Sequence, residues 1–307
     1  MSNNILAMKD TKLGMGWLRD YPDFRDFTIN WDKISQRLKR LGQLSIKEMF
    51  EKIGILNIIG TETTIPDKTD LRQWCPPIEN QESIGSCTAN AGAGMVEYYE
   101  KRAFNTYTDA SRLFLYKTTR NLLELKGDTG AYLRSTMAAL TLFGVPPEKY
   151  WPYIIKDYDK EPTAFCYSFA QNYQAIQYVR LDPYGINSQD LLNRIKTNLT
   201  AGIPSMFGFT VYSSIYNADK GKIPYPSSGD AIIGGHAVMA VGHDDSIAIT
   251  NADNQTTGAL LIRNSWGTGW GDAGYGWLPY NYVSNGLAVD WWTILRNEWI
   301  DTGEFEL

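Results

Sequence analysis

The sequence predicts an α+β protein with two lobes and a cleft between them. Helical periodicity dominates the chain up to about Thr200, and short apolar runs bounded by Gly, Asp and Asn dominate the remainder. Because the two patterns follow one another instead of alternating, they favour separate helical and strand-rich regions over a parallel, doubly wound sheet. A length of 307 residues with 43% hydrophobic residues is enough for one large domain or two small ones.

The N-terminal region is expected to form a unit of its own. Residues 16–27 contain aromatics, a proline and acids without a clear period, which is typical of a loop. Between residues 32 and 56, apolar side chains recur at steps of three to five, so we expect one or two short helices broken near Gly42. The polar stretch 60–67 is the best candidate for a boundary. We therefore expect an extension, residues 1–64, and a main domain, residues 65–307.

Four longer helices are expected in the main domain. The first runs from Cys87 to about Arg102, with Ala91, Met95 and Tyr99 along one face. Gly92 and Gly94 within it each cost about 1 kcal/mol relative to Ala, so we expect them to permit a close contact with another element. The other three helices are expected at residues 111–123, 131–143 and 189–200. Strands are expected at residues 237–241, 259–263 and 274–278.

Charge and hydropathy exclude several classes of partner. The net charge is −5 and no run of Lys and Arg is present, so neither a nucleic acid nor an anionic membrane is expected to bind. No stretch approaches the roughly 18 apolar residues that span a membrane. The first residues lack the apolar core of a secretory signal, which leads us to expect a cytoplasmic protein.

The counts of cysteine and histidine limit the possible chemistry. Three cysteines, Cys75, Cys87 and Cys166, are too few for a disulfide framework, and at least one thiol must be free. We expect Cys75 and Cys166 to be inert thiols, with a disulfide between them as the alternative. The chain has only two histidines, His236 and His243, and neither C-x-x-C nor H-E-x-x-H occurs. A metal centre is therefore not expected, and no cofactor is implied.

Three segments carry residue types suited to nucleophilic catalysis. They are Q-E-S-I-G-S-C-T-A at residues 81–89, G-G-H-A-V at 234–238, and R-N-S-W-G-T-G-W-G at 263–271. Cys87 would stand at the N-terminus of a helix, where the helix dipole and free N–H groups stabilise a thiolate. His236 would stand at the start of a strand and Asn264 at the end of another. His243, further along the strand of His236, is expected to be structural.

These segments, in this order, resemble the papain-like cysteine peptidases. His236 follows Cys87 at a distance within the range of about 130 to 150 residues typical of that family, whereas Asn264 lies beyond the range, which an insertion would explain. S-C-T-A-N-A and the N-terminal G-W-x-x-D-x-P-D-x-R-D are most similar to the bacterial branch. The resemblance implies a papain-like fold, with a helical lobe, an antiparallel β-barrel-like lobe and an active-site cleft between them.

The resemblance also implies a role for each residue of the site. Cys87 would be the nucleophile and His236 its imidazolium partner, which later gives a proton to the leaving amine. Asn264 would orient the ring of His236, with Trp266 shielding that hydrogen bond from water. The Gln81 amide and the Cys87 backbone N–H would form the oxyanion hole.

A second group of residues is implied in substrate binding. The backbone of Gly130 and Ala131 would pair with an extended substrate, and Tyr132 and Leu133 would line the main specificity pocket. Gly235 stands where many family members carry Asp or Asn. Two further departures from the family pattern are Thr88 in place of a Trp and Ile84 in place of a Cys.

Taken together, these features predict a cysteine endopeptidase that acts on peptides or proteins. Ile65 begins a segment that resembles the start of the mature family domain, so residues 1–64 occupy the place of a propeptide. We expect part of residues 17–59 to pack on the domain and obstruct the cleft, as in a zymogen; a permanently attached stabilising extension is the alternative. Two other functions stay open: a catalytically silent, peptide-binding relative and a cell-wall amidase.

Overall fold

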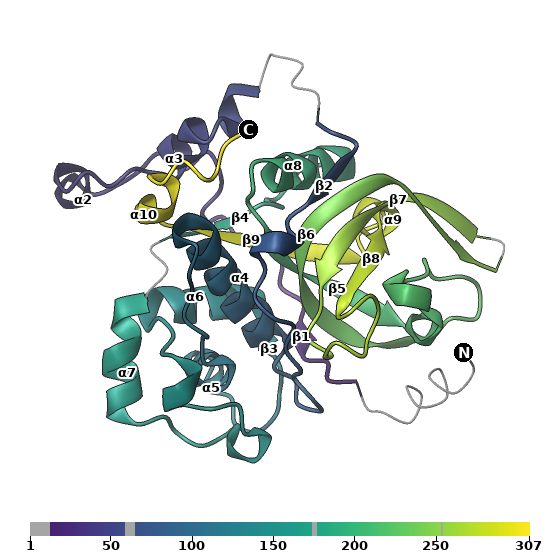
Figure 1. Ribbon diagram of the computed structural model, residues 1–307, viewed down its shortest axis with the longest axis horizontal. Coiled ribbons are helices and arrows are strands. Elements are labelled where there is room, and N and C mark those ends of the chain that lie inside the picture. The colour runs from purple at the N-terminus through teal and green to yellow at the C-terminus, as the bar shows by residue number, and fades with distance from the viewer. Residues whose placement is uncertain (1–12, 59–64, 174–176, 253) are drawn as a thin grey trace.

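The computed structural model describes residues 13–58, 65–173, 177–252 and 254–307. Most helices gather in one half of the molecule and a strongly curved sheet in the other, where α8 (Ser188–Thr200) and α9 (Tyr280–Ser284) pack against it (Figure 1). The predicted α+β architecture with two lobes is confirmed. Two expectations lie outside the described residues. The absence of a signal sequence concerns residues 1–12, and most of the expected boundary lies in residues 59–64.

The strands of the second lobe form one antiparallel sheet. Its order is β4-β9-β5-β6-β7-β8, and β2 pairs with β6 beside this path. The strands are β2 (Lys68–Asp70), β4 (Gln177–Arg180), β5 (Ser205–Tyr212), β6 (Ile232–Asn251), β7 (Asn254–Arg263), β8 (Tyr275–Pro279) and β9 (Ala288–Leu295). The three expected strands correspond to parts of β6, β7 and β8. Strands β5 and β9 show no alternation of polar and apolar residues because both of their faces are largely buried.

All the expected helices are present. The α-helices are α2 (Gln36–Arg40), α3 (Ile46–Lys52), α4 (Cys87–Phe104), α5 (Arg112–Leu122), α6 (Leu133–Leu142), α7 (Ala164–Ala170), α8 (Ser188–Thr200), α9 (Tyr280–Ser284) and α10 (Asn297–Ile300). Helix α6 begins two residues later than expected, because Ala131–Tyr132 forms a short strand, β3. None of the helices within the described ranges is long and apolar enough to cross a membrane.

The two glycines of α4 have the expected role. A Cβ atom at Gly92 would lie 3.1 Å from Cγ2 of Thr136 and 3.3 Å from Cδ2 of Leu115, so α4 packs closely against α5 and α6. A Cβ atom at Gly94 would overlap the guanidinium of Arg263, at the end of β7. Helix α4 therefore contacts both lobes, which fixes the position of its first residue, Cys87.

The N-terminal segment departs from the expected loop at one point. Trp17–Leu18 forms a strand, β1, that pairs in parallel with β3, and residues 19–27 are irregular apart from a turn. A pairing of only two residues gives no periodic signal in the sequence. In Figure 1, β1 lies between the helical lobe and the sheet.

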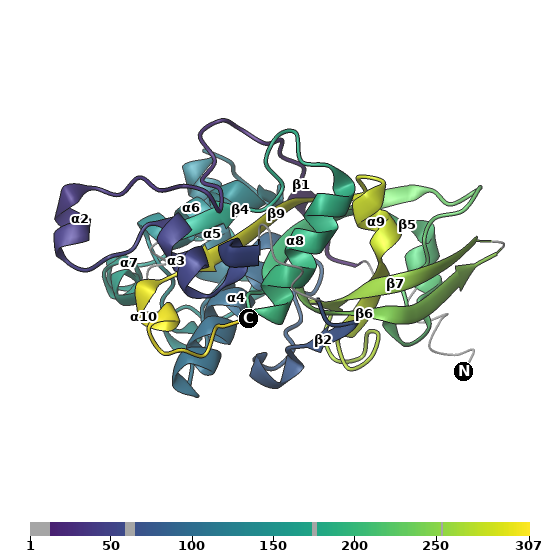
Figure 2. The same cartoon turned by 90° about the horizontal axis from the view of Figure 1, so that it is seen from above.

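Helix α3 packs in the main hydrophobic core. Ser45 caps it: the Ser45 Oγ accepts a hydrogen bond from the Glu48 N–H (3.2 Å), and the Ser45 N–H donates to the Glu48 carboxylate (2.7 Å). Met49 and Phe50 of α3 are fully buried, and α3 lies beside the C-terminal helix α10 (Figure 2). This part of the N-terminal region therefore shares its core with the rest of the molecule.

We expect the Phe50→Ala variant to lose about 3–5 kcal/mol of unfolding free energy, because a buried ring is replaced by a cavity. Urea denaturation of the full chain measures this loss. Phe24→Ala is the matched control, since Phe24 is 93% exposed and its removal should change stability by less than about 0.5 kcal/mol. Equal stability of the two variants would show that α3 is not part of the cooperative core.

Candidate active site

Cys87 is the first residue of α4 and is fully buried. The loop before it is held by side chains of the helical lobe. The Gly85 N–H donates to Oδ1 of Asp128 (2.8 Å), and the hydroxyls of Ser86 and Tyr153 lie 2.6 Å apart. These contacts fix the turn that places the thiol at the positive end of α4.

His236 lies on β6, opposite Phe209 of β5, and its ring is fully buried. Its Nε2 lies 2.7 Å from Oδ1 of Asn264, the residue that directly follows β7. The indole of Trp266 stacks on the imidazole, with ring centroids 4.3 Å apart and an interplanar angle of 19°. The structure thus brings together His236, Asn264 and Trp266 in the arrangement that the motifs imply.

Gln81 connects the loop before Cys87 to the segment of Asn264. Its Nε2 donates to the carbonyl of Ile84 (2.9 Å), and its Oε1 accepts from the Ser265 hydroxyl (2.6 Å). Its backbone N–H donates to the Ser265 carbonyl (2.8 Å). Ser265 is therefore a positioning residue that was not predicted from the sequence. Its place between Asn264 and Trp266 in the motif is a signal from which this role could have been predicted.

Burial keeps the side chains of Cys87 and His236 neutral near pH 7. It raises the pKa of Cys87 to about 11, against the opposing effect of the backbone N–H groups of Ala237 and Gly16. It lowers the pKa of His236 to about 4, against the opposing hydrogen bond with Asn264. The second ring nitrogen of His236, Nδ1, has no hydrogen-bond partner among the described residues. The imidazole thus keeps one free position for proton exchange.

An extended segment of residues 13–18, which we call the strap, lies between the loop before Cys87 and the strand β6 that carries His236. Its glycines face the loop before Cys87: a Cβ atom at Gly14 would lie 2.6 Å from the Glu82 carbonyl oxygen, and one at Gly16 would overlap the Gly85 carbonyl. Its larger side chains face the other lobe, because Met15 and Trp17 pack over Gly234 and Gly235 of β6. This alternation fits G-M-G-W to the space between the lobes.

The strap is bound by residues expected to bind substrate. The Ala131 N–H donates to the Gly16 carbonyl (2.8 Å), and Nε1 of Trp266 donates to the Gly14 carbonyl (2.9 Å). Gly130 adopts a left-handed φ of 73° and approaches Gly16 so closely that any side chain at Gly130 would overlap the Gly16 carbonyl. Gly130, Ala131 and Trp266 therefore form a backbone-binding edge, which the strap occupies.

The remaining expected substrate-binding residues differ in accessibility. Gly235 lies against the indole of Trp17, and a Cβ atom there would lie 2.9 Å from Cε3 of that ring. Tyr132 is half-buried, whereas Leu133 at the start of α6 is fully buried in the core. Because Leu133 is fully buried, it does not line an open pocket in the structure.

The other cysteines and the second histidine lie outside this group. Cys75 and Cys166 are buried free thiols and form no disulfide. His243 lies further along β6, and its Nδ1 is 3.6 Å from Oδ1 of Asp245. Within the part of the chain that the structure describes, no group of three His, Cys, Asp or Glu side chains could hold a metal ion.

A buried cysteine at a helix N-terminus, with its thiol near the N–H of Ala237, and a histidine–asparagine pair on a second, antiparallel β lobe define a thiol protease. Residues 65–293 match the model of the papain family cysteine proteases, and the chain belongs to that family. The match begins at Ile65.

Two of the similar proteins below also match much of the chain outside residues 65–293. An uncharacterized peptidase C1-like protein of Acanthamoeba polyphaga mimivirus is 32% identical over 91% of this chain and 86% of its own length. The crystal structure of xylellain, a cysteine protease from Xylella fastidiosa, superposes with a TM-score of 0.70 at 32% identity, covering 93% of this chain and 98% of xylellain. Digestive procathepsin L 3 of Tenebrio molitor shares the fold at 17% identity, with a TM-score of 0.58 over 77% of this chain and 72% of its own.

Proposed function

We propose that this thiol protease is an endopeptidase in which Cys87 is the nucleophile and His236 the general acid and base, held latent by its own strap. The observation that carries the proposal is the strap itself, which lies on the backbone-binding edge, with the Gly16 N–H near the Cys87 thiol and Trp17 against Gly235, the residue before His236. Peptides and proteins are the proposed substrates, and the chain's own N-terminal segment is the proposed inhibitor.

The chemistry follows from the groups at the site. With the strap displaced, water reaches the pair and the burial penalty on charge falls, so a proton can pass from the Cys87 thiol to Nδ1 of His236. The thiolate then attacks the scissile carbonyl, and His236 returns the proton to the leaving amine as the thioester forms. Water activated by His236 hydrolyses the thioester and frees the thiol.

Two donors are suited to stabilise the oxyanion during attack. The Cys87 backbone N–H stands at the start of α4, where no preceding helical carbonyl accepts it. Nε2 of Gln81 donates to the Ile84 carbonyl in the closed state and would share or exchange that bond with the oxyanion. Ser265 holds the other end of the Gln81 amide, so the amide keeps its orientation.

Two carbonyls of the strap are bound away from the oxyanion donors, which supports a blocking role. Its two bonded carbonyls, Gly14 and Gly16, accept from Trp266 and Ala131, and neither accepts from Gln81 or from the Cys87 N–H. A carbonyl that does not reach the oxyanion donors gains no stabilisation on attack. The parallel pairing of β1 with β3 keeps the strap in this arrangement.

Opening the cleft in the whole folded protein provides the test. Phe24 is exposed at the tip of a turn, while Arg134 binds Asp26 (2.8 Å) and the Tyr21 carbonyl (2.7 Å) on either side of it. A recognition sequence for a site-specific protease, inserted between Phe24 and Arg25, would allow the purified chain to be cut there. The peptide that carries the strap is then removed; we call the product the cut chain.

We expect an epoxide that alkylates thiols to label the cut chain once, at Cys87, and to leave the uncut chain unlabelled at pH 8. A thiol with a pKa of about 11 is only about 10⁻³ ionised at that pH. In the uncut chain, labelling should rise with pH towards 11; in the cut chain it should already be complete below pH 9. Intact mass measures the adduct, and Cys87→Ala is the control. If the cut chain is neither labelled nor active, the protein is a silent peptide-binding relative.

A further inference from the structure

Residues 31–44 form an arm that stands out from the rest of the molecule. Helix α2 lies at its tip, and none of the five residues of α2 is buried. Figures 1 and 2 both show α2 at the outer end of this arm, beyond the helices of the main domain. The side chains of α2 therefore add nothing to the hydrophobic core, and the strap does not include them.

The arm is nevertheless held in one shape. The Lys47 N–H donates to the Trp31 carbonyl (3.0 Å), which closes the base of the arm. Nε2 of Gln177 donates to the Leu44 carbonyl (3.2 Å), and Ser35 caps α2. Loops whose ends meet in this way are compact and frequently functional. A partner would therefore meet a preformed surface.

The arm carries positive charge that is not neutralised. Four of its side chains are exposed cations that form no ion pair with another described residue: Lys33, Arg37, Lys39 and Arg40. With Asp32 as the one acid of residues 31–44, the arm has a net charge of +3, whereas the whole chain has a net charge of −5.

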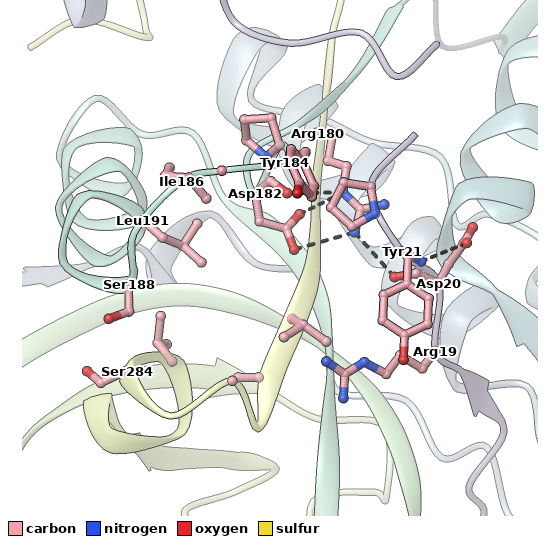
Figure 3. A pocket seen from close by; sticks show the side chains of 17 residues that line it. Arg19, Asp20, Tyr21, Arg180, Asp182, Tyr184, Ile186, Ser188, Leu191 and Ser284 are labelled. Carbon is pink, nitrogen blue, oxygen red and sulfur yellow. Dashed lines mark hydrogen bonds and ion pairs between the residues drawn. The ribbon is translucent and has the colours of Figure 1, made fainter. Parts of the chain in front are cut away.

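The pocket between residues 19–22 and β9 shows the contrast. There the guanidinium of Arg180 donates to the Asp182 carboxylate (2.9 Å) and to the Asp20 carbonyl (3.3 Å), as Figure 3 shows. The charge of Arg180 is thus balanced within the protein, whereas the four cations of the arm are left for a partner.

An apolar pocket of about 220 Å³ lies between the arm and the main domain. The Phe27 ring in this pocket makes edge-to-face contacts with Trp31 (5.1 Å) and Tyr178 (5.8 Å). Ile34 and Leu38 line the pocket from the arm, and Leu38 is 40% exposed. Small-molecule sites are usually larger, at roughly 300–1,000 Å³. This pocket has the size for one large apolar side chain.

We propose that the arm is a docking site for an acidic segment of a partner protein, which places one large apolar side chain in this pocket and its carboxylates beside the four cations. An apolar anchor in a pocket with a charged rim is the arrangement that dominates many protein interfaces. The charge of the arm attracts acidic segments and repels basic ones. This inference goes beyond the proposed function and does not rest on it.

Two other anionic partners fit the arm less well. Binding in a membrane interface needs a helix with a large apolar face, and α2 has only five residues. Single-stranded nucleic acid needs open aromatic faces on which bases stack. The rings of Trp31 and Tyr178 are half-buried and pack against Phe27. An acidic peptide uses both the pocket and the charge.

The test measures peptide binding to the full chain carrying Cys87→Ala, in which Cys87 cannot cut the probe. The probe is a fluorescein-labelled peptide, Asp-Glu-Asp-Leu-Glu-Asp-Glu, and its partner has alanine at the centre. By fluorescence anisotropy, we expect the leucine peptide to bind with a micromolar Kd and the alanine peptide at least about tenfold more weakly, because leucine buries more apolar surface. Added salt should weaken binding of both peptides.

Variants of the arm locate the charge contribution. Arg37→Gln combined with Arg40→Gln should weaken binding of the leucine peptide at least about fivefold, because two exposed cations are lost. The matched control is Lys126→Gln combined with Lys149→Gln, which removes the same charge from two exposed side chains outside the arm. The control should change Kd by less than about twofold. Circular dichroism checks that both double variants are folded.

A peptide with photo-leucine at its centre locates the anchor. After irradiation, we expect mass spectrometry to find the cross-link within residues 27–46 or at Tyr178. Cross-links elsewhere, equal effects of the two double variants, or no saturable binding up to about 1 mM peptide would each overturn the inference. Binding of phosphatidylserine vesicles or of a single-stranded oligonucleotide in place of the peptide would also overturn it, since the arm would then serve a different polyanion.

Discussion

Cys87→Ala is expected to reduce kcat/KM of the cut chain on a fluorogenic peptide by at least about 10⁴-fold. The reason is that the covalent route through a thioester disappears, and only water remains to attack a carbonyl held by the oxyanion donors. The residual rate should not depend on thiol-alkylating reagents. A loss of less than about tenfold would mean that another group is the nucleophile.

The other two thiols provide matched controls for this prediction. Cys75 is buried, its thiol donates to the Leu71 carbonyl at 3.7 Å, and burial raises its pKa to about 11. Cys166 lies in a small separate cluster with Phe114 and Ala170. Neither faces His236, so Cys75→Ala and Cys166→Ala should keep the activity of the cut chain at temperatures where they remain folded.

The site could be predicted from the sequence where the residues stand at the ends of regular elements within recognisable motifs. Cys87 begins a helix with a clear apolar face, and Asn264 follows an apolar strand, so local patterns place both. The two glycines of α4 could also be interpreted correctly, since glycine inside a helix is costly unless packing requires it.

The strap and the bulge between β9 and β5 could not be predicted in the same way. The strap is bound by Ala131 and Trp266, which are far away in the sequence, through a pairing too short to give a period. Asp290 is a single acid within the apolar strand A-V-D-W-W-T, and its left-handed φ of 64° lies in a bulge that follows from the pairing of β9 with β5. A buried acid between large apolar residues was nevertheless a signal that could have been followed.

A single methyl group at Gly16 is expected to open the cleft of the uncut protein. The Cβ atom of Gly16→Ala would overlap the backbone carbonyl of Gly85, in the loop that Asp128 holds by a 2.8 Å hydrogen bond. Because a backbone carbonyl in a fixed loop cannot move aside as a side chain could, the strap must lift. Overpacking of this kind costs about 1–3 kcal/mol, so we expect peptide hydrolysis by the uncut chain to rise by up to about 100-fold.

Gly269→Ala is the control for this experiment, because a Cβ atom at Gly269 would meet nothing within 4 Å. It adds the same methyl group to the same chain and should leave the uncut protein as inactive as its parent. If Gly16→Ala also stays inactive while the cut chain is active, the strap adapts to the methyl group and its fit does not depend on the glycine. If Gly16→Ala is active and its Cys87 is alkylated, the close approach of Gly16 to Gly85 maintains latency. Activation would then need displacement of the strap only, because α3 stays in the core of the uncut chain.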